Sequence, residues 1–439
     1  MVQLAPQEVE PVTVIGGFDA KAFASLSKVG EAAIVSRKRL EAFKSYSTLA
    51  VPTARDDEWR RTDPLLFPFG KLTPPAALEQ VEPGKGEAWD DEFDVVVSVG
   101  DETYSIHDRS GALKSGKVHV MSLADAAAKL PEVLERFLQG SALPEQPRKF
   151  AQMADAFWNV GLLIHVPTKT VLEKGVLVRY QHAAANGLVI PRVLVVVEDQ
   201  SEARMVEHFS SGSDPFFCIG SREFYVGQNS FLKLVSALEW GNNTFHIGED
   251  WARVGRDGKI DWVTLTLGGK VCKLMVGSDV CEPNAQAYLS GVFFADEDQH
   301  VDQRTLQLHS SPDTYSNLLY KGAVKDRGHS VYQGVINAKP GAIRVDAYQI
   351  NNNLILSEGA RADSLPGLEI DADDLKCSHG ATCGTLDPEQ LHYLRTRGLD
   401  ATEATRLIVT GFFEDVVSKV PYEFLQERLR EHIQVKIGS

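Results

Sequence analysis

The stretch HSVYQGVINAKPGAIRVDAYQINNN, His329–Asn353, shows the pattern that recurs through the middle of the chain. Two runs rich in β-branched, aromatic and other apolar residues are separated by Ala-Lys-Pro-Gly, and three asparagines end the second run. Short runs of this kind, bounded by Gly, Pro, Asn or Asp, are typical of strands. We expect the asparagines, Asn351–Asn353, at a polar corner, because Asn tolerates left-handed backbone. The stretch therefore predicts consecutive strands joined by tight turns.

Similar runs recur on both sides of this stretch, from about Phe157 to about Lys376, with almost no helical periodicity between them. They include GLLIHVP, GVLVRYQH, PRVLVVVED, SFLKLVSALEW and AYLSGVFFA, at intervals of roughly ten residues. A sandwich or barrel is one solution. A parallel β-helix is another, in which each strand turns a corner and pairs with the next coil. No strict repeat is visible, so the pattern predicts a mainly β region and leaves its architecture open.

The two flanks of this region are different in character. Phe18–Tyr46 has apolar residues at helical spacing, with Asp19 as a possible N-cap, and Ser122–Gly140 is also predicted to be helical. Glu92–Gly100, between them, is predicted to be a strand. We therefore expect an N-terminal mixed or mostly helical domain over residues 1–155 and a β core over residues 156–384.

Residues 385–439 carry clear helix signals and predict a small C-terminal helical domain of three helices. Asp387, Pro388 and Gln390 resemble an N-cap, a first-turn proline and the end of a capping box. Asp400 and Glu403 form a second capping box before the next helix. The apolar stripe expected to face the core on that helix is Ala404, Leu407, Ile408, Gly411 and Phe412.

Composition excludes several classes of function. The chain has 439 residues and a formal net charge of −15, which repels nucleic acid. Its apolar runs are far shorter than the ~20 residues of a membrane span, and the first residues do not resemble a signal peptide. Five cysteines in a long chain indicate a reduced cytosolic protein. The sequence contains no P-loop and no nucleophile elbow, so we expect neither nucleotide binding by that route nor an enzyme.

The segment KCSHGATCGTLDPEQLHYLRTRGL, Lys376–Leu399, holds the candidate site. Cys377 and His379 are two residues apart, so on a strand both side chains lie on one face. Thiolate and imidazole suit iron, zinc or an iron–sulfur cluster, which need about four ligands. Cys383 is a doubtful third ligand because we expect it in a turn, so another chain has to supply the rest. The alternative is a buried structural cysteine beside a histidine that caps the sheet.

Other candidates carry weaker signals. The acidic run Asp371–Asp374 suits a cation or paired catalytic carboxylates, but a solvated loop is the better explanation. His300 and His309 are nine residues apart, which we interpret as about one coil, and we expect stacked core histidines or cap histidines, not metal ligands. Cys218 has aromatic neighbours and is expected to pack in the core. Arg55–Asp63 is interpreted as a surface loop anchored by Trp59, with partner docking as the alternative.

The candidate segment resembles the SufB/SufD family of iron–sulfur cluster assembly proteins, and within it the SufD type of subunit. The likeness extends back through NNNLILSEGARADSLPGLEIDADDLKCSHGA and DQHVDQRTLQLHSSPDTYSNLLYKGAVKDRGHSVYQG, and it covers about the last 280 residues well. Two positions favour SufD over SufB. Gly380 follows the histidine where SufB has Glu, and Asn351 stands near the place where SufB has a cysteine.

This resemblance implies a right-handed parallel β-helix core flanked by N-terminal and C-terminal helical domains. It implies a non-catalytic scaffold that assembles nascent iron–sulfur clusters with SufB and the ABC-type ATPase SufC, which docks on the C-terminal helical domain. Sulfur comes from a cysteine desulfurase system, and the subunit forms a homodimer in the absence of SufB. The implied ligands of the transient cluster are His379 and, beside it, Cys377, shared with SufB; Cys383 is given no role.

The resemblance also implies a bacterial cytoplasmic protein, with the plastid stroma as the alternative, and flavin binding is not readable from the sequence. Two competing hypotheses come from other classes of protein. One is a β-helix enzyme acting on polysaccharide, with Asp371–Asp374 as its acidic cluster. The other is a purely structural homodimer, which tolerates substitution of His379.

Overall fold

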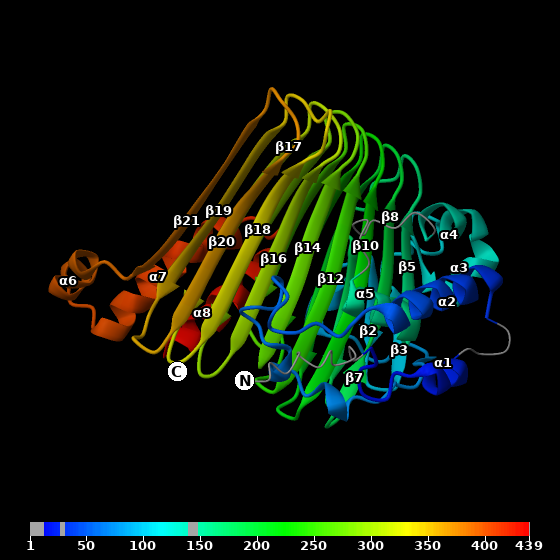
Figure 1. Cartoon of the computed structure of the whole chain (residues 1–439), viewed down its shortest axis with the longest axis horizontal. Helices are drawn as coiled ribbons and strands as arrows, with labels where there is room; N and C mark the ends of the chain where they lie inside the picture. Colours follow the sequence, from blue (N-terminus) through cyan, green and yellow to red (C-terminus); the bar gives the residue numbers. More distant parts are fainter. Residues whose placement is uncertain (1–12, 27–30, 139–147, 439) are drawn as a thin grey trace, which may run out of the picture.

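The core of the molecule is a β-solenoid of two facing sheets, with helices on the outside of both (Figure 1). The computed structural model describes residues 13–26, 31–138 and 148–438. Within them one sheet has 11 strands and the other has 10, one of which, β7, pairs with β10 beside the main path. Consecutive coils pair in parallel along both sheets. The prediction of a mainly β chain with a parallel β-helix is therefore confirmed.

The 11-stranded sheet consists, in order, of β1 (Glu79–Gln80), β3 (Thr103–Asp108), β2 (Val95–Val99), β6 (Val176–His182), β9 (Glu202–Ser211), β11 (Phe231–Glu239), β13 (Lys259–Thr266), β15 (Gln286–Ala295), β17 (Tyr315–Val324), β19 (Asp346–Ile355) and β21 (Lys376–Thr385). The 10-stranded sheet consists, in order, of β20 (Arg361–Ile370), β18 (His329–Ala338), β16 (His300–His309), β14 (Val271–Val280), β12 (Thr244–Val254), β10 (Phe216–Val226), β8 (Pro191–Val197), β5 (Val160–Val166) and β4 (His119–Ser122), with β7 (Gly187–Val189) beside β10.

The solenoid has a structural repeat that is not visible as a repeat in the sequence. A left-handed residue recurs at one corner of successive coils, at Asn229, Asp257, Asn284, Asp313 and Asp374 among others. Asn and Asp adopt this conformation more readily than other residues with a side chain. One coil therefore spans close to thirty residues; His300, for example, pairs with His329 of the next coil.

Two sequence predictions about corners and coils are wrong. Asn351–Asn353 lie inside β19, where two of the three side chains face the lumen and hydrogen-bond to each other, so they form no corner. His300 and His309 stand at the two ends of the single strand β16, so nine residues span a strand and not a coil. The nine-residue spacing between the two histidines is therefore the length of one strand and not the length of one coil.

The N-terminal residues extend both sheets and cover one of their faces. Strand β2 pairs with β6, and β4 pairs antiparallel with β5. Helices α1 (Ala20–Leu26), α2 (Ala33–Thr48) and α5 (Lys149–Phe157) pack with aromatic side chains on the outer face of the 10-stranded sheet. Within the described part of the helix predicted over Ser122–Gly140, two short helices form, α3 (Leu123–Lys129) and α4 (Pro131–Phe137), because Pro131 starts a new helix; residues 139–140 lie outside the described residues. Short 3-10 helices lie at Pro64–Leu66, Phe69–Lys71 and Ala88–Glu92.

The C-terminal helices α7 (Ala401–Val417) and α8 (Glu423–Gly438) pack on the outer face of the 11-stranded sheet, and α6 (Pro388–Thr396) projects from the body (Figure 1). The predicted core stripe of α7 is right at Ala404, which is buried, but wrong by about one residue further along: Phe413 is buried, whereas Leu407 is 55% exposed. Asp400 and Glu403 form the predicted capping box, but Asp387 caps α6 through the amide of Glu389 without Gln390.

Ion pairs hold α7 and α8 to the solenoid as well. Lys321 pairs with Asp415 of α7 at 2.5 Å, and Glu239 pairs with Arg428 of α8 at 2.6 Å. Lys436 of α8 pairs with Asp296. Glu239 is almost fully buried, and its partners hold the pKa of its carboxyl far below the usual range although burial acts in the opposite direction. These two helices are therefore fixed to the sheet, in contrast to α6.

Candidate functional site

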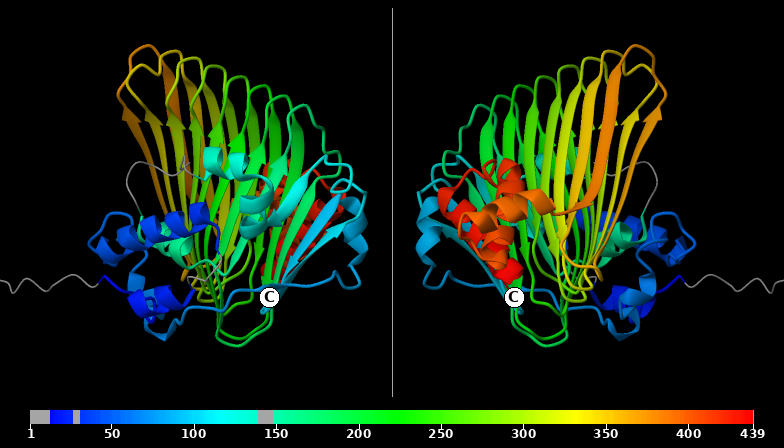
Figure 2. Two further views of the ribbon diagram at one scale, coloured as in Figure 1. Left: turned by 90° about the vertical axis from the view of Figure 1, so that its right-hand side faces the viewer. Right: turned by 90° about the vertical axis from the view of Figure 1, so that its left-hand side faces the viewer.

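Strand β21 ends the 11-stranded sheet and carries the candidate residues. It pairs with β19 on one side, and no described strand lies on its other side (Figure 2, right). Strand β20 ends the other sheet in the same way. An uncovered edge presents unpaired N–H and C=O groups, which are a ready template for pairing with another chain. This end of the solenoid is thus open in both sheets.

Cys377, His379 and Cys383 lie on one face of β21, since side chains two and four residues apart on a strand point the same way. Their register partners on β19 are Ala347, Gln349 and Asn353. All three partners are buried in the lumen. The three residues therefore face the lumen at its open end, where His379 and Cys383 are exposed because no further coil covers them.

Cys377 lies at the apolar side of this opening. Its half-buried side chain packs with Ala372 and Leu375 against a small cluster that includes Ile336 and Val345. Burial raises the pKa of its thiol, and the carboxylate of Asp346 acts in the same direction. The thiol is therefore held protonated unless a metal ion or a positive group binds it.

Cys383 lies at the polar side, in the strand and not in the turn that we predicted. The side-chain amide of Asn353 donates a hydrogen bond to its Sγ at 3.5 Å. The same amide donates to Asn351 at 2.6 Å, and the hydroxyl of Ser364 also donates to Asn351 at 2.6 Å. Burial raises the pKa of Cys383, and the hydrogen bond from Asn353 counteracts that effect. A buried network of amides and a hydroxyl thus supports this thiol.

Gln349 lies next to His379 in register, one coil further into the lumen. It is fully buried, and neither atom of its side-chain amide has a hydrogen-bond partner among the described residues. Its Nε2 reaches across to Gly334, where a Cβ would lie only 2.5 Å away. A glycine is therefore needed opposite this amide. The polar group behind the exposed imidazole has unused hydrogen-bonding capacity.

A second buried polar group lies deeper in the lumen and was missed by sequence reasoning. Arg222 donates from Nε to Asp250 at 2.6 Å and from a terminal nitrogen to Glu207 at 2.7 Å. Burial raises the pKa of Glu207 to about 7. The three residues come from three strands, so no local sequence motif predicts that they lie together. One guanidinium shared by two buried carboxylates fits a structural network.

The other sequence candidates are explained by the fold. Asp373 is exposed, and Asp374 forms a left-handed corner, as a solvated loop requires. His309 is buried, with its ring nitrogens 2.8 Å from the hydroxyls of Thr314 and Ser316. Burial lowers its pKa to about 4. Cys218 is buried in the lumen, as predicted.

The charged stretch Arg55–Asp63 crosses the outer face of the 10-stranded sheet. Trp59 is buried there, and the ammonium group of Lys273 lies 4.7 Å from its ring. Thr62 donates to Asp302 at 2.6 Å. The interpretation as a loop anchored by Trp59 is therefore confirmed, with Thr62 as a second anchor.

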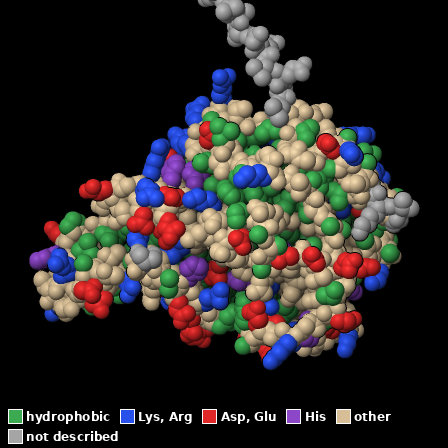
Figure 3. Space-filling view, turned by 90° about the horizontal axis from the view of Figure 1, so that it is seen from below, with side chains coloured by type: hydrophobic (Ala, Val, Ile, Leu, Met, Phe, Trp, Pro, Cys, Tyr) green, Lys and Arg blue, Asp and Glu red, His purple; other side chains and the backbone are tan. Residues whose placement is uncertain are grey.

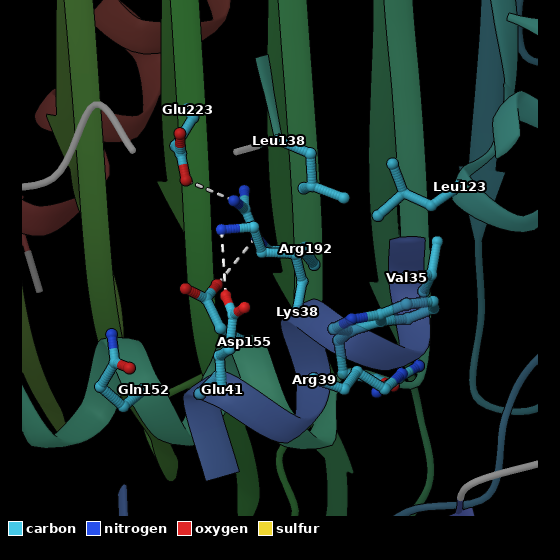
Figure 4. Close-up of a pocket in the computed structure, with 12 residues that line it drawn as sticks. Val35, Lys38, Arg39, Glu41, Leu123, Leu138, Gln152, Asp155, Arg192 and Glu223 are labelled. Atoms are coloured by element: carbon cyan, nitrogen blue, oxygen red, sulfur yellow. Dashed lines mark hydrogen bonds and ion pairs between the residues drawn. The ribbon is translucent and has the colours of Figure 1, made fainter. Parts of the chain in front are cut away.

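A small cavity lies on this same outer face, between α2, α5 and the 10-stranded sheet (Figure 4). Its volume is about 170 Å³, and at its floor Arg192 contacts Asp155 at 2.8 Å and also pairs with Glu223. None of the residues predicted for the site lines it. The buried charges at this floor pair with one another.

The projecting helix α6 has no buried residue. Tyr393 on α6 is 54% exposed, and Leu407 at the start of α7 is 55% exposed. Figure 3 shows hydrophobic side chains on the projecting arm, interspersed with charged ones. Uncovered apolar side chains on a projecting helix are typical of a protein interaction site.

No group of three or more His, Cys, Asp or Glu side chains among the described residues is placed to hold a metal ion. Among the same residues, no helix combines the length and the apolar character needed to cross a bilayer.

Comparison with known proteins identifies relatives over most of the chain. Residues 180–412 match the family described as SUF system FeS cluster assembly, SufBD core domain. An iron–sulfur cluster assembly SufBD family protein of Mycobacterium tuberculosis is 29% identical over 411 residues, covering 91% of this chain and 93% of the relative. The iron–sulfur cluster assembly protein SufD of Bacillus subtilis is 26% identical, covering 93% and 95%. SufD of Escherichia coli is 30% identical over 54% of this chain and 56% of its own length.

Proposed function

Because the chain belongs to the SufBD family of the SUF system for iron–sulfur cluster assembly, we propose that it is a SufD-type scaffold subunit. In this role it performs no catalysis of its own. Its open solenoid end pairs with SufB, and there His379 and Cys377 help to hold the nascent cluster, which is cargo and not a resident cofactor. Its C-terminal domain, residues 385–439, binds the ATPase SufC. The whole process takes place in the bacterial cytoplasm.

The open end is the observation that carries the proposal. Strands β20 and β21 both have a free edge, and side chains that face the lumen become exposed there, among them Leu368 and Ile370 at 40% and 38%. A solenoid whose end stays in water normally closes it with a polar capping element. A second β-helix that continues both sheets satisfies the free edges and covers these side chains.

The number of cluster ligands that this chain can supply also requires a second chain. This chain offers one imidazole and one half-buried thiol, whereas a cluster takes about four ligands. His379 is exposed at the end of the lumen, so a partner strand beside β21 brings its own ligands to the same face. The raised pKa of Cys377 means that its thiol binds iron with loss of a proton.

The direct test is anaerobic reconstitution of the three-subunit complex with iron and sulfide, followed by visible absorbance and by iron and sulfide content. We expect His379→Ala to lower cluster content at least fivefold while the subunits stay assembled. The matched control is His107→Ala, which removes a half-buried histidine from β3, away from both proposed interfaces, and should load like wild type. Wild-type loading by His379→Ala contradicts the ligand role.

The proposed docking site for the ATPase is tested separately, by substitutions on α6 and at the start of α7. We expect Tyr393→Asp combined with Leu407→Asp to weaken SufC binding at least tenfold, because both substitutions place charge on exposed apolar positions. The matched control is Val435→Asp on α8, where the side chain is 67% exposed. Equal loss of binding in the control, or none in the double variant, moves the docking surface away from α6 and the start of α7.

A further inference from the structure

We propose that the cavity between α2, α5 and the 10-stranded sheet binds a small aliphatic primary amine, and that Asp155 accepts hydrogen bonds from its ammonium group (Figure 4). The cavity lies on the outer face of the solenoid, and none of its described lining residues belongs to β20, β21 or the C-terminal helices. The inference needs neither SufB, SufC nor a cluster, so it is independent of the function proposed above.

The volume of the cavity limits the size of the ligand. It is about 170 Å³. An apolar cavity of about 150 Å³ accepts benzene, whereas pockets for drug-sized molecules have roughly 300–1,000 Å³. The cavity therefore suits one molecule of about five to eight non-hydrogen atoms.

The lining has an apolar part and an acidic part. The apolar side chains are those of Val35, Ala42, Leu123, Leu138 and Trp158. They offer a short hydrocarbon chain a place out of water. At the floor the guanidinium of Arg192 lies between the carboxylates of Asp155 and Glu223 (Figure 4). This floor carries one more negative group than positive groups, so it favours a cationic ligand.

The other charged side chains around the cavity do not supply the missing positive charge. Lys38 pairs with Glu41 at 3.1 Å. Arg39 pairs with Glu31 at 3.0 Å, and its guanidinium lies 3.4 Å from the centre of the Trp158 ring. Both basic residues of α2 that line the cavity thus have an acidic partner of their own. The excess negative charge of the floor remains for a ligand to neutralise.

Asp155 is the group of the floor that a ligand can reach. Its side chain lines the cavity and is 18% exposed, whereas that of Arg192 is 5% exposed. It lies in the last turn of α5, which contains no basic residue, and the carbonyl groups of a helix end disfavour a negative charge. Burial raises the pKa of Asp155 and Glu223 acts in the same direction, although the charge of Arg192 opposes both.

An ammonium group beside Asp155 removes these unfavourable effects. It donates charge-assisted hydrogen bonds to the carboxylate and offsets the charge of the helix end. The methylene groups of the ligand then extend along the apolar side chains of the cavity. A neutral molecule of the same shape gains only the apolar contacts, so charge should dominate the selectivity of the site.

The test uses the full chain purified alone, with n-butylamine as the probe and isothermal titration calorimetry as the measurement. We expect saturable binding with a dissociation constant of about 1 mM or tighter. n-Butanol, which has the same chain without the charge, should bind at least tenfold more weakly. Asp155→Asn should weaken binding of n-butylamine at least tenfold. The matched control, Asp57→Asn, removes an exposed carboxylate outside the cavity and should bind like wild type.

A second variant keeps every charge in place. Ala42→Leu puts a larger side chain into the lining, so it should also weaken binding of n-butylamine at least tenfold, even if Asp155→Asn fails to fold. Equal binding of n-butanol and n-butylamine overturns the proposal, as does unchanged binding in either cavity variant or no saturable binding at about 10 mM probe. Tighter binding of Nα-acetyl-lysine amide than of n-butylamine overturns the assignment to a free amine, because it identifies a lysine side chain of another protein as the ligand.

Discussion

The two ends of the lumen differ in what lines them and in what covers them. The first coils are lined by valines from facing strands and are extended by β2 and β4 of the N-terminal region. The last coils are lined by amides and hydroxyls, and nothing in the described chain continues β20 or β21. The polar lining at the last coils is Gln303, Thr305, Gln307, Ser316, Gln349, Asn351 and Asn353.

The two ends of the lumen therefore differ in how much their side chains contribute to stability. An apolar lumen is stabilised by removal of its side chains from water, which the closed end provides. A polar lumen gains little from burial and costs free energy wherever a group lacks a partner. The C-terminal end thus keeps polar groups near an opening, where a partner or a ligand can use them. Substitutions at the two ends should therefore have different consequences.

The largest effect is expected from a charge placed in the closed end. Val195→Asp puts a carboxylate among buried valines, and we expect the free energy of unfolding to fall by about 4 kcal/mol or more. The matched change at the open end, Ala381→Asp, also faces the lumen but is exposed, so its cost should stay within about 1 kcal/mol. Urea unfolding measures both. Similar costs at the two positions contradict the distinction between the ends.

The buried histidines of the last coils should also make the free energy of unfolding depend on pH. Burial lowers the pKa of His309 to about 4, below its value of about 6.5 in the unfolded chain. Between pH 6.5 and 4 the unfolded state binds more protons, so the free energy of unfolding falls as the pH decreases through this window. The share of His309 is about 2–3 kcal/mol at the acid end. His300, whose pKa burial also lowers to about 4, adds a similar share.

Unfolding of His309→Gln at several pH values between 7 and 4 measures this contribution. The variant should lose stability less steeply than wild type on acidification. The control is His392→Gln on the exposed arm, which should follow the wild-type curve. Parallel curves for wild type and His309→Gln disprove the assignment of the pH dependence to this buried imidazole.

The smallest changes in the free energy of unfolding should come from substitution of two glutamines in the polar part of the lumen. One substitution should raise it and the other should lower it. Gln349→Leu removes an amide without a partner, so we expect the free energy of unfolding to rise by about 1 kcal/mol. Gln307→Leu removes an amide that donates to Ser316 at 2.7 Å, so it should fall by about 1–2 kcal/mol. Chemical denaturation of the two variants checks the signs. A loss of stability in Gln349→Leu shows that this amide has a partner in solution.

The strands could be predicted from sequence because each is a short run bounded by turn residues. The repeat could not, because coil lengths vary and the left-handed corner is held by Asn, Asp or even Arg344, which has a φ of 55°. The pattern alone therefore left a sandwich, a barrel and a β-helix open, and the family resemblance decided among them. The C-terminal caps were visible because capping is a local property of sequence.

The site could be predicted only in part for the same reason. The shared face of Cys377 and His379 follows from strand geometry within one segment. The contact of Asn353 with Cys383 depends on the register between β19 and β21, which no local pattern reveals. The apolar stripe of α7 was misplaced because this helix is apolar on two sides, and only packing against the sheet decides which side is buried.

If the chain works as proposed, SufB docks at the C-terminal end of the solenoid. Hydrogen–deuterium exchange of the free chain and of its complex with SufB tests this most directly. We predict that amides of β21 and β20 exchange about tenfold more slowly, or slower still, in the complex, because their free edges become paired. Amides of β2, β3 and β4 should exchange at the same rate in both states. Unchanged exchange in β21 and β20, with protection at the N-terminal strands, would contradict the claim.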